Sequence, residues 1–268
     1  MIKKSLRLVL RITTFVISAF LLVAVTLILA KAMAVRKGPD LEWWHTEVIS
    51  SEFRAKDSSD VATFDEYLER EDLVFKELQG LVDTAIAPKI TPRLSRFEVG
   101  NKAYPDKSGL NLNRSSERRP ASIRGGVLLL HGMTDSPYTL RHLAELFQQH
   151  GFYVLNLRLP GHGTIPSELD RMEWQDWLAA VGLAANHVTD QIKPTQPFYI
   201  LGYSNGGSLA LKYTMDSLGH DETRTQDQVF LLSPMIGVAS LARFSRLFYW
   251  LGRVEFFRHS RWLDILPE

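Results

Sequence analysis

Four short apolar runs, separated by segments long enough for helices, constrain the fold of this chain more than any other feature. The runs lie at residues 127–130, 152–157, 198–201 and 229–232. Apolar runs of this length are typical of strands that are buried on both faces, as in a parallel sheet. Parallel neighbours need crossover connections, which are right-handed βαβ units. The sequence therefore predicts an α/β fold with a mostly parallel sheet flanked by helices.

The connecting segments carry helix signals. Ser136 and Pro137 form an N-cap and first helical position, and Gly151 is placed to end that helix. Apolar residues recur at helical spacing in the ranges 140–147, 174–188 and, upstream of the strands, 64–81. A further helix is expected over 207–218. The polar region 91–122 is expected to hold one or two short edge strands.

Residues 202–206 read Gly-Tyr-Ser-Asn-Gly and stand between the strand at 198–201 and the helix that follows. A serine in a sharp strand-to-helix turn needs small neighbours, which Gly202 and Gly206 provide. The turn exposes the Ser204 hydroxyl beside a helix N-terminus, where N–H groups stabilise negative charge. The alternative is a turn that is merely rich in glycine and serine. The flanking strand and helix favour a nucleophilic serine.

Two further motifs follow predicted strands. Residues 131–137 read His-Gly-Met-Thr-Asp-Ser-Pro, and residues 159–163 read Leu-Pro-Gly-His-Gly. In an open α/β sheet the carboxyl ends of the strands gather the functional site. These two motifs and the Ser204 turn are therefore expected to lie together.

In their order and spacing, the three motifs resemble the α/β-hydrolase family, and most closely its branch of monoacylglycerol lipases, carboxylesterases and serine aminopeptidase-like proteins. The resemblance covers about residues 125–234. It implies that Ser204 is the nucleophile and that the backbone N–H groups of Met133 and Asn205 form the oxyanion hole. It also implies that His131 is structural, and that Gly132, Gly202 and Gly206 support the turns. No cofactor and no metal site are expected.

The end of the chain departs from that family. A hydrolase triad continues after the serine with an acid and then a histidine, on loops after two further strands. Only one credible strand, at 229–232, follows Ser204 here, and His220 comes too early to be the base. His259 precedes Asp264, which is the reverse of the family order. The acid and base are therefore unknown, and we expect the chain to be a fragment that ends inside a helical cap and leaves the strand at 229–232 as an apolar edge.

Residues 12–30 form an uncharged apolar run of 19 residues, long enough as a helix to span a bilayer. We expect a membrane anchor with a cytoplasmic N-terminus and the body on the outer, periplasmic or extracellular, side. The alternative is a signal peptide that is cleaved near Ala34, with secretion of the body. The first 37 residues contain basic but no acidic side chains, whereas the remainder carries a small net negative charge, and this distribution does not favour nucleic-acid binding. The absence of cysteine excludes disulfides and cysteine nucleophiles.

The predicted organisation has four parts: a basic leader and anchor (1–37), a linker with an amphipathic helix (38–95), the N-terminal part of the hydrolase core (96–240) and the start of a helical cap (241–268). The expected function is cleavage of a carboxylic ester, either lipid-like or a small acyl ester, through an acyl-enzyme on Ser204. Aromatic residues beyond 241 favour a substrate with an acyl chain. The alternatives are an inactive truncated hydrolase, a binding protein, or a peptidase or acyltransferase of the same fold.

Overall fold

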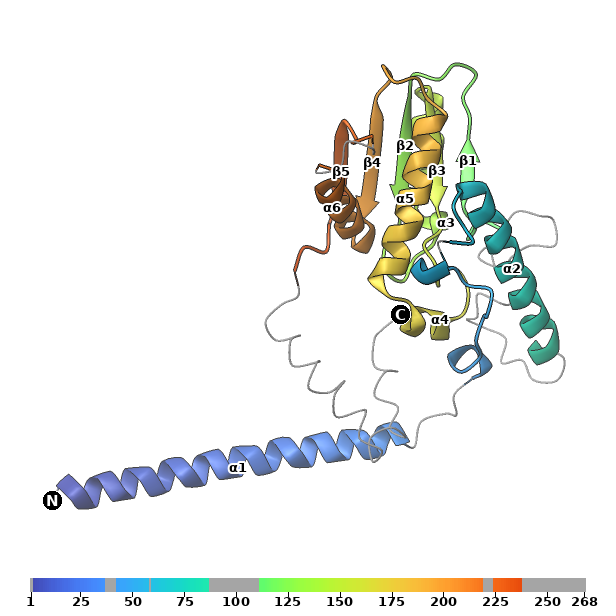
Figure 1. Cartoon of the computed structure of the whole chain (residues 1–268). Coiled ribbons are helices and arrows are strands. Elements are labelled where there is room, and N and C mark those ends of the chain that lie inside the picture. Colours follow the sequence, from blue (N-terminus) through green and yellow to red (C-terminus); the bar gives the residue numbers. More distant parts are fainter. Residues whose placement is uncertain (1, 37–41, 58, 87–110, 219–223, 238–268) are drawn as a thin grey trace. The chain divides into compact units, whose positions relative to one another are not determined.

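The computed structural model describes residues 2–36, 42–57, 59–86, 111–218 and 224–237 (Figure 1). The chain divides into two compact units. The body comprises Leu41–Ile236, and the second unit comprises Met1–Asp40 together with Gly237–Glu268.

The body is built on a five-stranded sheet in the order β1-β3-β2-β4-β5. Strands β2 to β5 pair in parallel, and β1 pairs antiparallel with β3. The four apolar runs all form strands, which confirms the predicted mostly parallel sheet, and β1 is an edge strand in the region where one was expected. The strands are β1 (Ser116–Arg118), β2 (Gly125–Leu130), β3 (Phe152–Leu157), β4 (Phe198–Tyr203) and β5 (Gln228–Leu232).

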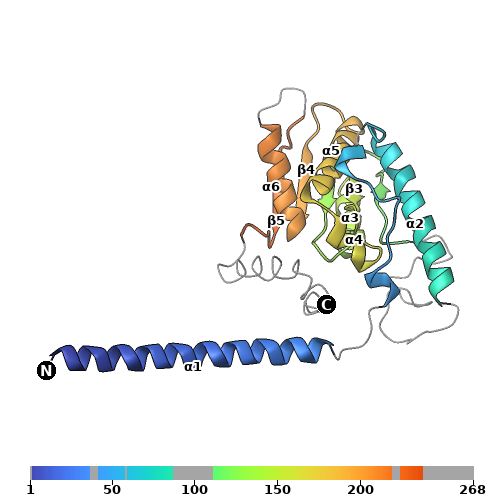
Figure 2. The ribbon, with the colours of Figure 1, turned by 60° about the horizontal axis from the view of Figure 1, so that its bottom comes forward.

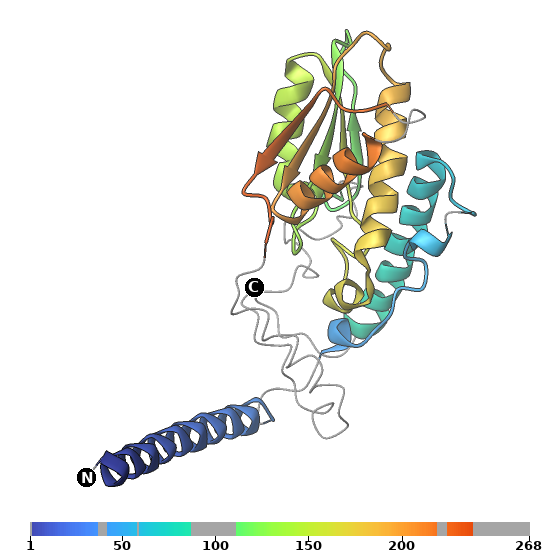
Figure 3. The same ribbon diagram turned by 60° about the vertical axis from the view of Figure 1, so that its left-hand side comes forward.

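Helices cover both faces of the sheet. Helix α3 (Pro137–Gln149) lies on one face, and α5 (Trp174–Asp190) and α6 (Asn205–Ser217) lie on the other (Figure 3). Helix α2 (Phe64–Ile86) packs against α5 and so forms an outer layer (Figure 2). All four were predicted, with ends that differ by a few residues. The short helix α4 (Pro166–Arg171) was not predicted.

The core follows the alternation of side chains along the strands. Leu128 and Leu130 of β2 face the layer of α5, whereas Val127 and Leu129 face α3, and all four are fully buried. Full burial of such a side chain stabilises the fold by about 1.5–3 kcal/mol. The sheet is therefore a rigid support whose strand ends have fixed positions.

The ends of α3 largely follow the prediction. Ser136 has extended N-cap backbone angles, but its side chain does not cap the helix, because its hydroxyl donates a hydrogen bond to the Asn113 Oδ1 atom at 2.7 Å. Gly151 follows the helix with a φ of +86°, a backbone conformation that favours glycine. The position of the N-cap was thus correct, and its side-chain interaction was not.

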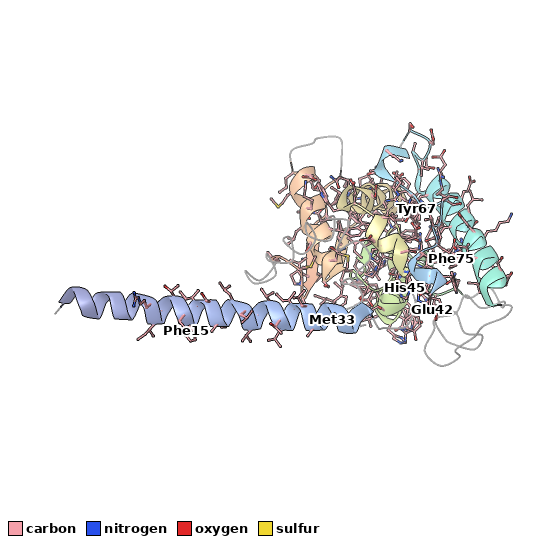
Figure 4. All side chains as sticks on the ribbon, turned by 90° about the horizontal axis from the view of Figure 1, so that it is seen from below. Phe15, Met33, Glu42, His45, Tyr67 and Phe75 are labelled. Carbon is pink, nitrogen blue, oxygen red and sulfur yellow. The ribbon has the colours of Figure 1, made fainter. Side chains whose placement is uncertain are left out.

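Residues 42–57, which were expected to be part of a linker, belong to the body and pack against the rest of it. Ile49 and Phe53 are buried, beside the 3₁₀ turns η1 (Trp43–His45) and η2 (Ala55–Asp57). Tyr67 and Phe75 point from α2 toward the rest of the body (Figure 4). The predicted domain boundaries after 95 and 240, and the predicted cap at 241–268, lie outside the described residues and remain predictions.

In the second unit, α1 runs from Ile2 to Arg36. Within the part of the chain that the structure describes, Arg11–Ala30 is the one helical stretch that is long and apolar enough to cross a membrane. Its apolar side chains are exposed, Phe15 among them (Figure 4). Length and composition alone do not separate a membrane span from a signal sequence.

Candidate active site

Ser204 is the single residue between the end of β4 and the start of α6, and its backbone is held in a strained conformation. Its φ is 51° and its ψ is −114°, in a region that residues other than glycine rarely occupy. Such strain costs about 1–3 kcal/mol and persists only where the surroundings impose it. Here the Ser204 N–H donates to the Leu232 carbonyl at 2.9 Å, and the Ser204 carbonyl accepts from the Met235 N–H at 3.0 Å. The end of β5 and the residues directly after it therefore fix the turn.

Two glycines allow the strand, the turn and the helix to approach one another. A Cβ on Gly202 would lie 2.6 Å from the Gly207 Cα, inside the first turn of α6. A Cβ on Gly206 would lie 2.6 Å from the His131 carbonyl oxygen and even closer to the Leu130 backbone. Real Cβ atoms are essentially never found at these distances. Gly206 thus sets how closely α6 approaches the end of β2.

The turn after β2 lies beside the Ser204 turn. Leu130 of β2 is the register partner of Gly202 in β4, so both strands end at the same edge of the sheet. Gly132 lies two residues after Leu130, and Ser204 lies two residues after Gly202. The two turns are close, because a Cβ on Gly132 would lie 3.2 Å from the Tyr203 ring. The structure thus brings the His131-Gly132-Met133 turn together with Ser204 and Asn205. Ser204 is half-buried, Asn205 is buried and Met133 is exposed.

His131 is fully buried and both of its ring nitrogens are engaged. Its Nε2 accepts a hydrogen bond from the Leu159 N–H at 3.1 Å, so the proton resides on Nδ1, which donates to the Gly132 carbonyl at 2.9 Å. Burial, and then the neighbouring His162, hold the pKa of His131 well below its ordinary value of 6.5. A neutral imidazole with no free nitrogen braces the two loops and is not placed to act as a base.

His162 completes the packing behind the turn. Its ring centroid lies 4.9 Å from that of His131 and 5.4 Å from that of Trp177. The Trp177 indole N–H donates to the Pro160 carbonyl at 3.0 Å, which fixes the loop between β3 and α4. Burial lowers the pKa of His162 to about 4. The two histidines are therefore neutral and buried, and they pack the loop against the turn.

The low pKa of His162 predicts a loss of stability in acid. The unfolded side chain takes up a proton near pH 6.5, whereas the folded one stays neutral down to about pH 4. Between these values the unfolded state binds more protons, so the free energy of unfolding falls as the pH falls, by about 3 kcal/mol in total for this residue. The raised pKa values of the buried carboxyls Glu71 and Glu168 act in the opposite direction.

Urea unfolding of the full-length chain in detergent, at several pH values, measures this effect. A His162→Gln variant removes the titration of His162, together with its effect on the pKa of His131, and leaves Glu71 and Glu168 in place. We expect the difference in unfolding free energy between wild type and variant to shrink from pH 7 to pH 4. A difference that does not change with pH would show that His162 titrates normally in the folded state.

The described part of the chain does not supply the acid or the base of a triad. No histidine in it forms a hydrogen bond with the Ser204 hydroxyl, and His220, His259 and Asp264 lie outside the described residues. Asp135, which follows the His131-Gly132-Met133 turn, accepts a hydrogen bond from the Thr139 hydroxyl at 3.0 Å and supports the start of α3. Among the described residues, no group of three or more His, Cys, Asp or Glu side chains could hold a metal ion.

One element of the site was missed from the sequence. Arg158, directly after β3, is buried and forms an ion pair with the buried Glu52 at 2.7 Å. The available signal was an arginine that immediately follows an apolar strand, since a buried charge needs an opposite charge nearby. The sequence did not indicate which of the many acidic residues would provide it.

Comparison with known proteins shows which family this chain belongs to. A family model described as "Serine aminopeptidase, S33" matches residues 121–260, which is just over half of the chain. The chain is 37% identical over 86 residues to a thermostable monoacylglycerol lipase of Bacillus sp. strain H-257, and this match covers 32% of the chain and 33% of the relative. A monoacylglycerol lipase of Mycolicibacterium smegmatis is 34% identical over 95 residues, with 34% of the chain and 32% of the relative covered.

A solved structure of the Paleococcus ferrophilus monoacylglycerol lipase aligns over 53% of this chain and 51% of its own, with 21% identity and a TM-score of 0.41. In the two sequence matches above, the chain spans about a third of the length of each lipase. The residues that the family model matches include the three motifs at 131–137, 159–163 and 202–206. The chain belongs to the serine aminopeptidase S33 family of hydrolases, with the α/β-hydrolase fold of the monoacylglycerol lipase and esterase branch.

Proposed function

We propose that this protein is a serine hydrolase that cleaves carboxylic esters with an acyl chain through an acyl-enzyme on Ser204. The observation that carries the proposal is the strained Ser204 turn, held by backbone contacts at the same sheet edge as the His131-Gly132-Met133 turn. Strained backbone in a residue other than glycine clusters at functional sites. A hydroxyl presented in this way beside a helix N-terminus is the arrangement that acyl transfer requires.

The proposed reaction begins with attack of the Ser204 oxygen on the ester carbonyl carbon, while a general base outside the described residues takes the hydroxyl proton. The carbonyl oxygen becomes an oxyanion, and the N–H groups of Met133 and Asn205 donate hydrogen bonds to it. Collapse of this intermediate breaks the bond to the alcohol, which leaves with a proton, and water then releases the acid from Ser204. Loss of one such oxyanion donor costs about 3–4 kcal/mol of transition-state stabilisation.

The names of the relatives support a lipid ester as substrate, because both are monoacylglycerol lipases. The family description points instead to a peptide amide. A panel of a monoacylglycerol, a short p-nitrophenyl ester and an aminoacyl p-nitroanilide distinguishes the two, with Ser204→Ala as the background. We expect hydrolysis of the esters, and higher kcat/KM for the monoacylglycerol than for the anilide. Hydrolysis of the anilide alone would make the protein a peptidase, and hydrolysis of none would leave it without this activity.

If the oxyanion donors are backbone groups, the Met133 side chain is dispensable. Its side chain is exposed, so Met133→Ala leaves the backbone N–H and its surroundings in place. We expect kcat on an ester to stay within about threefold of wild type, since an exposed truncation away from strained positions has small effects. A loss of about 100-fold, which is the loss expected for a missing oxyanion donor, would show that the Met133 side chain takes part.

We further propose that Arg11–Ala30 anchors the protein in a membrane, with the N-terminus in the cytoplasm and the body outside. The length and apolar composition of this helix support a membrane span. The basic residues before it support the orientation. N-terminal sequencing of the membrane fraction and protease treatment of intact cells test it. We expect an uncleaved N-terminus and a body that the protease digests. A mature protein that starts near Ala34 would instead show a cleaved signal peptide.

A further inference from the structure

We propose that Glu52 is a positioning residue for catalysis: through Arg158, His162 and His131 it fixes the orientation of the Met133 N–H group. This inference rests on the proposed function, because it assigns a remote support to the oxyanion donor. Glu52 belongs to the segment before α2, which lies outside the residues that the family model matches.

The first step is the buried ion pair. The Glu52 carboxylate accepts two hydrogen bonds from Arg158 Nη2, at 2.8 and 2.7 Å, and one from the Gly161 N–H at 2.8 Å. Both side chains are almost completely buried. Removal of one partner from such a pair is costly, because the other charge remains buried and uncompensated. Glu52 therefore determines where the Arg158 guanidinium and the Gly161 peptide lie.

The second step is the loop between β3 and α4. The Arg158 Nε donates a hydrogen bond to the His162 carbonyl at 2.7 Å, and Gly161 between them has a φ of +77°. The Arg158 carbonyl in turn accepts from the Tyr67 hydroxyl at 2.7 Å. The loop is thus closed around the guanidinium, whose ion-pair partner among the described residues is Glu52.

The third step joins this loop to the proposed oxyanion turn. The Leu159 N–H of the loop donates to His131 Nε2 at 3.1 Å, and His131 Nδ1 donates to the Gly132 carbonyl at 2.9 Å. The Gly132 carbonyl and the Met133 N–H belong to the same peptide group, which is planar. A hydrogen bond that fixes the carbonyl oxygen therefore also fixes the direction of the N–H. The position of the loop is in this way transmitted to the donor.

The charges around the loop support this arrangement. His131 accepts from Leu159 only while its Nε2 is unprotonated, and burial followed by the neighbouring His162 keeps its pKa low, with a further contribution from Arg158. Burial is the largest effect and lowers the pKa of Arg158, but the charges of Glu52, Tyr67 and Glu71 and the hydrogen bond to Glu52 together outweigh it, so the pKa is raised. The guanidinium therefore stays charged, and the histidines in front of it stay neutral.

The variant Glu52→Gln tests the inference, since it keeps the size of the side chain and removes the charge. We expect ester hydrolysis by the full-length protein to lose roughly tenfold to 100-fold in kcat, with little change in KM, because a misplaced donor acts on the transition state. A specific readout is the preference for an ester over its thionoester, whose sulfur accepts hydrogen bonds poorly. We expect this preference to fall in Glu52→Gln. The variant Glu52→Asp retains the charge and should recover part of the kcat.

Asp176→Asn is the matched control. The Asp176 carboxylate also ties the same N-terminal segment to the body, because it accepts from the Ala55 N–H at 2.7 Å and from the Glu173 N–H at 2.9 Å. It is buried like Glu52, but its hydrogen bonds within the described residues go to Arg54, Ala55 and Glu173 and not to the loop of Arg158. We expect comparable destabilisation in both variants, and an altered oxygen-over-sulfur preference only in Glu52→Gln. Equal loss of kcat and an unchanged preference in both would overturn the inference and leave Glu52 as a general structural residue.

Hydrogen exchange keeps the inference separate from the proposed function. In Glu52→Gln the N–H groups of Leu159, Gly161 and Asp135, which are hydrogen-bonded in wild type, should exchange faster than in wild type, whereas in Asp176→Asn they should not. This readout needs no activity. If wild type does not hydrolyse esters, the proposed function fails, yet exchange still shows whether Glu52 orders the turn. If wild type is active and exchange at Leu159 and Asp135 is unchanged in Glu52→Gln, the inference alone is wrong.

Discussion

Ester hydrolysis is expected to fall by at least about 10⁴-fold in Ser204→Ala, because the variant lacks the atom that attacks the carbonyl carbon. The stability of the fold should not change. Serine and alanine both carry a Cβ, so the strain at φ 51° is the same, and the Ser204 hydroxyl has no hydrogen-bond partner within the described part of the chain. The free energy of unfolding should therefore change by less than about 0.5 kcal/mol.

A glycine at the same position separates strain from chemistry. Ser204→Gly also removes the nucleophile, but glycine adopts this conformation without the Cβ penalty, so the variant should be more stable than wild type by about 1 kcal/mol. Parallel kinetics and urea unfolding of the two variants check both statements. Residual hydrolysis above about 1% of wild type in either variant would place the nucleophile elsewhere.

Gly206→Ala is expected to have the second-largest effect, although it adds only one methyl group. The new Cβ would lie 2.6 Å from the His131 carbonyl oxygen and nearer still to the Leu130 backbone. Because these neighbours are backbone atoms at the end of a buried strand, α6 must move away. We expect a loss of about 3 kcal/mol or more in stability and, in the folded fraction, roughly a 100-fold loss of kcat, since the displacement separates Ser204 from the turn after β2.

Gly182→Ala is the matched control for this substitution. Gly182 lies within α5, and a Cβ there would meet no atom within 4 Å. Alanine in a helix interior is more favourable than glycine by about 1 kcal/mol, so this variant should gain stability and keep its activity. If Gly206→Ala were as stable and as active as Gly182→Ala, the close approach of α6 to β2 would not be needed for the site.

The sheet and its helices could be predicted because their signals are local. A strand such as 127–130 is apolar on both faces, and the helix that begins at Pro137 has a proline at its first position and a glycine after its end. The neighbourhood of Ser204 and Met133 followed from the rule that parallel strands end at one edge. The register of Leu130 with Gly202 agrees with that expectation.

The supports behind the site could not be predicted, because they join residues far apart in the sequence. Glu52 and Arg158 are separated by 106 positions. The residues next to Glu52 in the sequence do not distinguish it from the other acidic residues before α2. The segment around Ile49 and Phe53 resembles a linker in composition and yet packs onto the body. Pairing of buried charges depends on the tertiary fold, which a linear pattern does not contain.

The central claim is that Ser204 is an activated nucleophile, and covalent labelling tests it most directly. The full-length protein is treated with a fluorophosphonate probe, digested, and searched by mass spectrometry for the adduct on every serine, with Ser204→Ala treated in parallel. The account predicts one adduct, on Ser204, and none in the variant. An adduct on a different serine, or no adduct in wild type, would contradict it.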